Sequence, residues 1–332
     1  MSEYGGLVSG HWRAFRHSPY LPALVIVLIV AASAGLFAGS YTYAMANPTP
    51  REVPVAVVGR PDGAFLDALQ ERLSASLDRR EYADYPQAVD AVEAQRVFAI
   101  VRERNGRIEL DTASAAGASV AELLTGAARA AARSVDARLD IRDLKPLHPG
   151  DPRGLALFYL SIAAVITGFL GAVQLSANAG TLKPLERALA TAAYALLGGF
   201  AIVATVTWLL DAVELPFPQS WTIVSLTMFA SGMTFTMFNT LVRRWAILPT
   251  WVLMVMLGNP SSGGAVSWPL LPSVLGAIGR WLPPGASVNA QHTAVYFAGH
   301  QHVQPYLVLV GWAAASCTVF AIWRHHHPGG RD

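Results

Sequence analysis

The sequence predicts a polytopic α-helical membrane protein with six transmembrane helices and an extracytoplasmic α/β domain inserted between the first and the second. The chain is 53% hydrophobic and only 14% charged, with a mean hydropathy of +0.38, whereas soluble chains are about 25% charged. Long apolar runs alternate with short polar loops, except that residues 46–152 form one block rich in charge. These observations predict a membrane domain at residues 153–323 and a separate water-compatible domain before it.

Five apolar runs are long enough to cross a bilayer, since a spanning helix needs about 20 apolar residues. They lie at residues 21–45, 155–175, 189–210, 221–241 and 304–323. A sixth run, residues 245–257, is shorter: at ~1.5 Å per residue it covers about 20 Å of a hydrocarbon core about 30 Å thick. This run spans the bilayer only if the residues after it extend the helix or add to its length.

The first run, in residues 1–45, is typical of a retained anchor and not of a cleaved signal peptide. The tripeptide AMA at residues 44–46 has the form of a cleavage site. The apolar run before it, however, is well beyond the ~7–15 residues of a signal peptide's apolar region. Within the run, Gly35 and Gly39 form a G-x-x-x-G pair, which lets two helices approach closely.

The basic residues predict the orientation of the chain. With six crossings, one side carries Arg13, Arg16, Lys183, Arg187, Arg243, Arg244, Arg324 and Arg331, whereas the short loops on the other side carry only Arg280. The positive-inside rule then places both termini, including a tail at residues 324–332, in the cytoplasm. Scarce lysine beside abundant arginine and alanine is typical of a GC-rich genome, so we expect a multi-pass protein of a bacterial cytoplasmic (inner) membrane. The apolar spans make the lipid bilayer its partner. A net charge of +2 is too small to suggest that the chain binds nucleic acid.

Residues 46–152 hold 17 of the 22 acidic residues and have the pattern of a small α/β domain. We expect a strand at residues 53–59, a helix at 61–77 capped by Asp62, a short helix running into a strand at 98–102, a hairpin partner after the turn at 104–106, and a long helix at 118–140. Its carboxylates alternate with arginines, which is typical of a solvated surface and not of a catalytic site.

The sequence offers no catalytic, metal or cofactor site on this chain. Cys317 is the only cysteine, and His292, His300 and His302 have no acidic or cysteine ligand nearby. No charged residue lies in the middle of a predicted span, whereas ion-coupled carriers usually keep a carboxylate there. We therefore expect a protein that is neither an enzyme nor an ion-coupled carrier.

One loop after the short apolar run, here called the NPSSGG loop, breaks regular structure at membrane depth. A phosphate-binding loop would need a lysine after the glycine pair, and a serine nucleophile would need the spacing G-x-S-x-G and a carboxylate to orient His292. The remaining interpretation is a sharp reversal of the chain that lines a translocation path or gate, because non-helical backbone in a membrane must be buried in protein or face a wet cavity. The loop consists of Asn259, Pro260, Ser261, Ser262, Gly263 and Gly264.

The residues after this loop predict an interfacial helix within a re-entrant or interfacial segment at 258–300. Apolar residues follow at helical spacing and are bracketed by Trp268 and Trp281. Tryptophans at both ends are typical of an element that lies at the level of the lipid head groups.

Three sequence segments carry a family resemblance: NPSSGG, LPPGASVNAQHTAVYFAG at residues 282–299 and, more weakly, AVDAVEAQRVFAIVRE at residues 88–103. With one span, an outer domain of about a hundred residues and then five spans, the chain resembles the permeases of type-2 ABC exporters. It resembles most their YhgE/Pip (phage infection protein) branch.

The resemblance implies a dimeric permease that moves hydrophobic or amphiphilic cargo outward and is powered by a separate ABC ATPase. No ATPase domain is fused to this chain, so the ATPase would be a separate subunit. It would contact the short inner loop at Leu182, Lys183, Pro184 and Leu185. The alternative is a membrane receptor or assembly factor that does not transport and uses its outer domain to bind a partner.

Overall fold

The computed structural model describes residues 20–46, 50–61, 63–73 and 76–327. Within that part, five helices are long and apolar enough to span a membrane: α2 (Tyr20–Met45), α6 (Ala156–Asn178), α7 (Pro184–Ala204) with a π-helical continuation (Thr205–Leu209), α8 (Phe217–Val242) and α12 (Gln304–His326). Each overlaps one of the five long apolar runs, which supports the prediction of a membrane protein. The helix α2 up to Tyr43 belongs to one compact unit and all other elements to a second.

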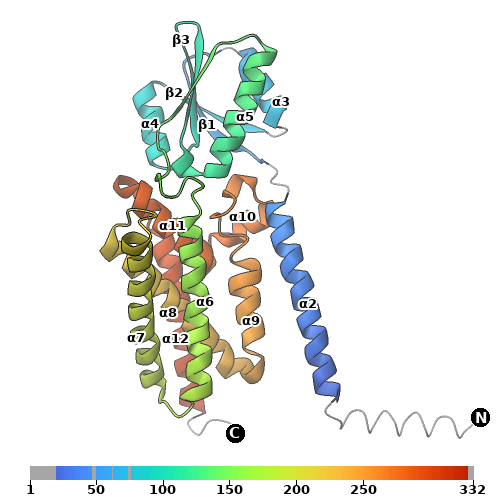
Figure 1. Cartoon of the computed structure of the whole chain (residues 1–332), viewed down its shortest axis with the longest axis vertical. Helices are drawn as coiled ribbons and strands as arrows, with labels where there is room; N and C mark the ends of the chain where they lie inside the picture. Colours follow the sequence, from blue (N-terminus) through green and yellow to red (C-terminus); the bar gives the residue numbers. More distant parts are fainter. Residues whose placement is uncertain (1–19, 47–49, 62, 74–75, 328–332) are drawn as a thin grey trace, which may run out of the picture. The chain divides into compact units, whose positions relative to one another are not determined.

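In the second unit, α8 is the central membrane helix. It packs against α6, α7 and α12, as Figure 1 shows. The approach to α6 is close because Gly168 has no side chain: a Cβ there would lie 2.8 Å from the Cα of Met228. The hydroxyl of Tyr194 on α7 donates to the carbonyl of Gly168 at 2.7 Å. Small residues and interhelical hydrogen bonds are the usual basis of helix packing in membranes.

The short apolar run forms α9 (Ile247–Trp251) and a π-helical continuation (Val252–Leu257). These 11 residues rise about 16 Å, so a sixth crossing stays a prediction. They start beside the end of α8, where Asn239 contacts Ser176 near the end of α6. The NPSSGG loop that follows contacts Phe158 at the beginning of α6. The chain therefore continues from one end of the helices toward the other before it reaches the loop, and the predicted reversal at the loop stays a prediction.

The charged block forms a five-stranded sheet with strand order β2-β1-β3-β4-β5, in which only β3 and β4 pair antiparallel. Helices α3 and α5 pack on one face and α4 on the other. The β3–β4 turn is as expected: Asn105 and Gly106 have φ of 54° and 67°, the left-handed conformation that a two-residue hairpin needs. The elements are β1 (Val53–Val58), α3 (Gly63–Leu73), β2 (Leu77–Tyr82), α4 (Tyr85–Glu93), β3 (Ala99–Arg104), β4 (Arg107–Thr112), α5 (Ala118–Ser134) and β5 (Leu139–Asp143).

Two strands replace the ends of expected helices. The helix expected at residues 61–77 ends at Leu73, and Leu77 begins β2 instead; the predicted cap Asp62 lies outside the described residues. The helix expected at residues 118–140 ends at Ser134, and Asp136 then takes a φ of 52°, which separates it from β5. Both strands lie at the edges of the sheet, where charged side chains are common. At the other end of the chain, α12 continues to His326, so the predicted tail begins inside a helix.

The core of the α/β domain extends beyond residues 46–152. Leu270, which is 1% exposed, packs into the cluster formed by β1, α3 and α5, and Val266 packs beside it. The backbone N–H of Arg51 donates to the carbonyl of Pro269 at 2.9 Å. A segment between two membrane helices therefore completes the domain and fixes it to the membrane part of the unit.

Candidate binding cavity

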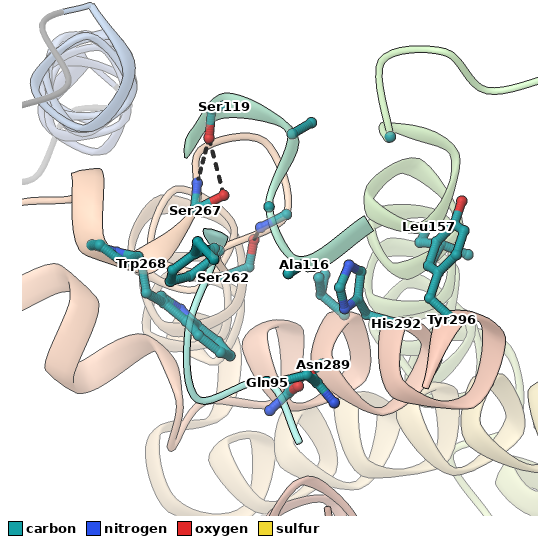
Figure 2. A pocket seen from close by; sticks show the side chains of 18 of the residues that line it. Gln95, Ala116, Ser119, Leu157, Ser262, Ser267, Trp268, Asn289, His292 and Tyr296 are labelled. Atoms are coloured by element: carbon teal, nitrogen blue, oxygen red, sulfur yellow. Dashed lines mark hydrogen bonds between the residues drawn. The ribbon is translucent and has the colours of Figure 1, made fainter. Parts of the chain in front are cut away.

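A cavity of about 740 Å³ lies where the α/β domain meets the membrane helices. Its walls come from the turns before β3 and α5, from the start of α6, from residues 262–269, and from the helices α10 (Ser273–Gly279) and α11 (Pro283–Tyr296). Figure 2 shows these segments around the cavity. Its volume lies within the roughly 300–1,000 Å³ of small-molecule sites.

The NPSSGG loop forms part of this wall. Ser262, Gly263 and Gly264 line the cavity, while Asn259 and Ser261 are buried behind them, at 2% and 0% exposed. The serine hydroxyls donate to backbone carbonyls of the same segment, Ser261 to Leu257 at 2.6 Å and Ser262 to Asn259 at 2.7 Å. They thus satisfy the backbone of a broken helix end, as Ser side chains commonly do.

The two glycines of the loop allow a close approach to aromatic rings. Gly263 has a φ of 82°, a conformation that side chains rarely adopt, and a Cβ there would lie 2.7 Å from the ring of Trp268. A Cβ at Gly264 would lie 2.7 Å from the ring of Phe158. The glycines therefore set the shape of the cavity wall.

The predicted interfacial helix is two separate pieces, a 3₁₀ turn (Trp268–Leu270) and α10. Trp268 is half-buried over Gly263 and donates its indole N–H to the carbonyl of Ser261 at 3.2 Å. Trp281, in contrast, is 64% exposed. Val274 and Ile278 on α10 are exposed as well, whereas Leu270 turns into the α/β domain. That the segment lies at the lipid head groups stays a prediction.

Arginines give the cavity a positive rim. Arg80, Arg96, Arg153 and Arg280 line it, together with His292 and His302, and no Asp or Glu is among the described lining residues. Arg80 is paired with Asp78, and Arg280 lies 5.2 Å from the centre of the Trp268 ring. The deeper wall is apolar, with the buried side chains of Leu157, Phe158 and Val288. An anionic group is favoured at the rim and an apolar group further in.

His292 lies at the contact between α11 and the α/β domain. Burial lowers the pKa of its ring to about 4, although a hydrogen bond with the backbone of Ala115 opposes this shift. The ring is therefore neutral at pH 7, and the positive charge of the cavity comes from its arginines. Of the other predicted histidines, His302 lines the cavity and His300 is exposed away from it. In the part of the chain that the structure describes, no three acidic, histidine or cysteine side chains form a possible metal site.

The predicted ATPase-contact loop lies at the other end of the helices. Leu182 and Lys183 precede α7, Pro184 begins it, and Leu185 is 70% exposed. The carboxylate of Glu186 accepts the backbone N–H of Lys183 at 2.8 Å, which holds the start of the helix. This surface and the cavity are thus separated by the length of α6, about 34 Å.

Sequence reasoning missed the contribution of the α/β domain to the cavity. Gln95, Ser114 and residues 116–119 line it, and Figure 2 shows Ser119 hydrogen-bonded to Ser267. A signal for this contact is the run of small residues ASAAGAS at 113–119. A Cβ at Gly117 would lie 2.5 Å from the hydroxyl oxygen of Ser267, so only a small residue lets the two segments meet.

Comparisons with protein-family models, with curated proteins and with solved structures find no match to this chain.

Proposed function

We propose that this chain is the membrane permease of an exporter of the type-2 ABC class and moves an amphiphilic cargo outward across a bacterial cytoplasmic membrane. The observation that carries the proposal is the cavity itself, because the NPSSGG loop lines it together with the α/β domain. Irregular backbone at this depth is tolerated where it is buried or borders a wet space.

The cargo class follows from the two parts of the cavity wall. Arg96, Arg153 and Arg280 at the rim have no carboxylate partner among the described residues, and guanidinium groups bind phosphate and carboxylate well. Leu157 and Phe158 supply an apolar wall further in. A molecule with an anionic head and an apolar chain satisfies both.

The source of energy is proposed to be a separate ATPase. No acidic residue lies in the middle of a predicted span, where it could couple transport to an ion. The exposed Leu185 and its neighbours at the start of α7 give a contact surface at the end of the helices away from the cavity. The two termini are proposed to be cytoplasmic, and a second copy of the chain to complete a dimeric permease.

One observation favours the alternative of a receptor or assembly factor. Much of the cavity wall belongs to the α/β domain, including Gln95, Ser114 and residues 116–119. A ligand bound there can act on the domain without crossing the membrane. The two functions share the ligand site and differ in whether an ATPase is bound.

Photo-crosslinking separates the two functions. A photoreactive residue is placed at Leu182 and, as a control, at Leu197, which is 73% exposed in the middle of α7. Irradiation of native membranes is expected to link an ABC ATPase to the first position and none to the second. Absence of an ATPase at Leu182, in cells where the protein is functional, would support the receptor.

A binding measurement tests the cargo class. Dodecyl phosphate is titrated into the purified chain in neutral maltoside detergent and followed by calorimetry. Arg153→Gln and Arg280→Gln are each expected to weaken binding up to about fivefold, because an exposed ion pair is worth about 1 kcal/mol or less. Arg60→Gln, on the α/β domain but outside the cavity, is the matched control. Equal affinity in all variants would remove the anionic head group from the proposal.

A further inference from the structure

A second, smaller cavity of about 200 Å³ lies at the end of the membrane helices farthest from the α/β domain. Its walls come from the ends of α6, α8 and α12 and from the beginning of α7. Three arginines line it, Arg187, Arg243 and Arg324, together with Asn239 and Trp323. The described lining residues include no Asp or Glu.

Arg187 is the buried charge of this pocket, at 8% exposed. Its guanidinium donates to the hydroxyl of Ser176 at 2.8 Å and to the carbonyl of Ala179 at 3.3 Å. Both acceptors are neutral, and no salt bridge to Arg187 occurs among the residues that the structure describes. A guanidinium has five N–H donors, and burying one without an anion is unfavourable.

A second arginine adds to this unfavourable charge. Arg324, on the last turn of α12, is close enough to Arg187 for their charges to repel. Arg243 ends α8 with a φ of 54° and a ψ of −126°. A residue other than glycine keeps such a conformation only when its surroundings impose it, and such residues cluster at functional sites.

We propose that this pocket binds a phosphate group, either in the head group of an anionic phospholipid or as free phosphate. Convergent guanidinium groups match the geometry and the charge of phosphate oxygens. At about 200 Å³, the pocket is smaller than whole-ligand sites of about 300–1,000 Å³, so it takes one ionic group. The inference does not depend on transport, because it rests on residues outside the large cavity.

The surroundings of the pocket offer room for lipid chains. Leu241 and Val242, next to Arg243, are 50% and 43% exposed, and Ile322, next to Trp323, is 55% exposed. Apolar side chains exposed at the end of a membrane helix face lipid, and Trp is enriched at that depth. A phospholipid bound by its phosphate would have its acyl chains beside these residues.

Native mass spectrometry of the full chain in neutral maltoside detergent tests the proposal by counting bound dioctanoyl phosphatidic acid. Arg324→Gln is expected to lose one bound lipid relative to the unchanged chain, and so is Arg187→Gln. The side chain of Arg324 makes no hydrogen bond or salt bridge in the described structure, so its variant is expected to keep the fold even if Arg187→Gln does not. The matched control is Arg244→Gln, which removes a neighbouring arginine outside the pocket and should lose none.

A competition arm distinguishes the two sources of phosphate. Displacement of that lipid by inorganic phosphate in large excess means that free phosphate fits the pocket, while no displacement assigns the pocket to a lipid head group. The proposal is overturned if the unchanged chain and Arg324→Gln bind the same number of phosphatidic acid molecules. It is also overturned if Arg244→Gln loses as many as Arg324→Gln.

Discussion

The two arginine-lined cavities differ in size and in what builds them. The one beside the α/β domain is about 740 Å³ and is enclosed by turns, a broken helix and two short helices. The one at the far end is about 200 Å³ and is enclosed mainly by the ends of long packed helices. Under the two proposals, arginine side chains would have two roles: they would form the rim around a whole amphiphile in the large cavity and hold a single ionic group in the small one.

The difference in construction predicts a difference in rigidity. The large cavity depends on contacts between segments far apart in the chain, such as Ser119 with Ser267, 148 residues away. The small pocket depends on helices that pack along their length. Regions held by few contacts between loops open more easily than packed helices. We expect changes at the domain contact to alter the large cavity and to leave the small one intact.

The largest expected effect comes from Leu270→Ala, which removes the membrane segment's residue from the α/β core. Burial at 1% exposed predicts a loss of about 2–5 kcal/mol in the free energy of unfolding of the domain. Faster hydrogen exchange in β1 and α5 measures it, with Val274→Ala, at 65% exposed, as the control. The expected difference in rigidity between the cavities is wrong if this variant also loses the phosphatidic acid that is proposed to bind at Arg187.

Gly263→Val should have the next largest effect, because it forces a branched side chain into a φ of 82° against Trp268. Backbone strain of this kind costs about 1–3 kcal/mol, and the Trp268 ring, which lines the cavity, must shift. Dodecyl phosphate binding should weaken while membrane insertion is unchanged. The double variant Ser261→Ala with Ser262→Ala should bind almost normally. If the double serine variant binds dodecyl phosphate more weakly than Gly263→Val does, the hydroxyls and not the glycine have the main role.

Acid should destabilise the domain contact through His292. Its pKa is about 4 in the folded chain and 6.5 as the ordinary value, so the unfolded chain binds the proton more readily between these pH values. The contribution of neutral His292 to the free energy of unfolding is therefore present above pH 6.5 and is lost as the pH is lowered toward 4. The loss between pH 7 and 5 is up to about 2 kcal/mol. Thermal unfolding should show a shallower loss in His292→Gln, but not in His300→Gln. Equal slopes would exclude His292 as the source.

Ser119→Ala is the mildest test of the contact. Its hydroxyl accepts the backbone N–H of Ser267 at 3.0 Å, and a hydrogen bond of this kind contributes about 0.5–1.5 kcal/mol. Hydrogen exchange at residue 267 should quicken. Ser134→Ala, whose hydroxyl bonds only within its own helix, should leave that rate unchanged. A rate at residue 267 equal in both variants would mean that the Ser119 hydroxyl does not help to hold the segment.

Local sequence pattern was enough to predict the long helices and the β3–β4 hairpin. A run of about 20 apolar residues has few alternatives to a membrane helix, and Asn105 with Gly106 favours one turn type. The edge strands β2 and β5 were missed because their sequences, LDRREY and LDIRD, have mixed charge. Their strand state depends on pairing with β1 and β4, which lie elsewhere in the chain.

In the candidate sites, too, local sequence pattern does not predict features that depend on contacts with distant residues. The glycines of the NPSSGG loop could be singled out because two adjacent glycines after a helix require a particular backbone. The path of the chain through the loop could not be predicted, since it is set by packing against Phe158 and Trp268. The burial of Arg187 could not be predicted either, because it depends on the convergence of the ends of several helices.

The position of Leu270 in the α/β core has a consequence for biosynthesis. The ribosome has made every strand of the sheet long before it makes this residue, and Ser119 waits for a partner that is 148 residues away. At ~5–20 residues per second this delay is roughly 7–30 s. The nascent domain would spend that time with an open apolar site, and it would close only after the intervening membrane helices had been inserted. Completion of the domain thus depends on a segment that follows several apolar helices in the chain.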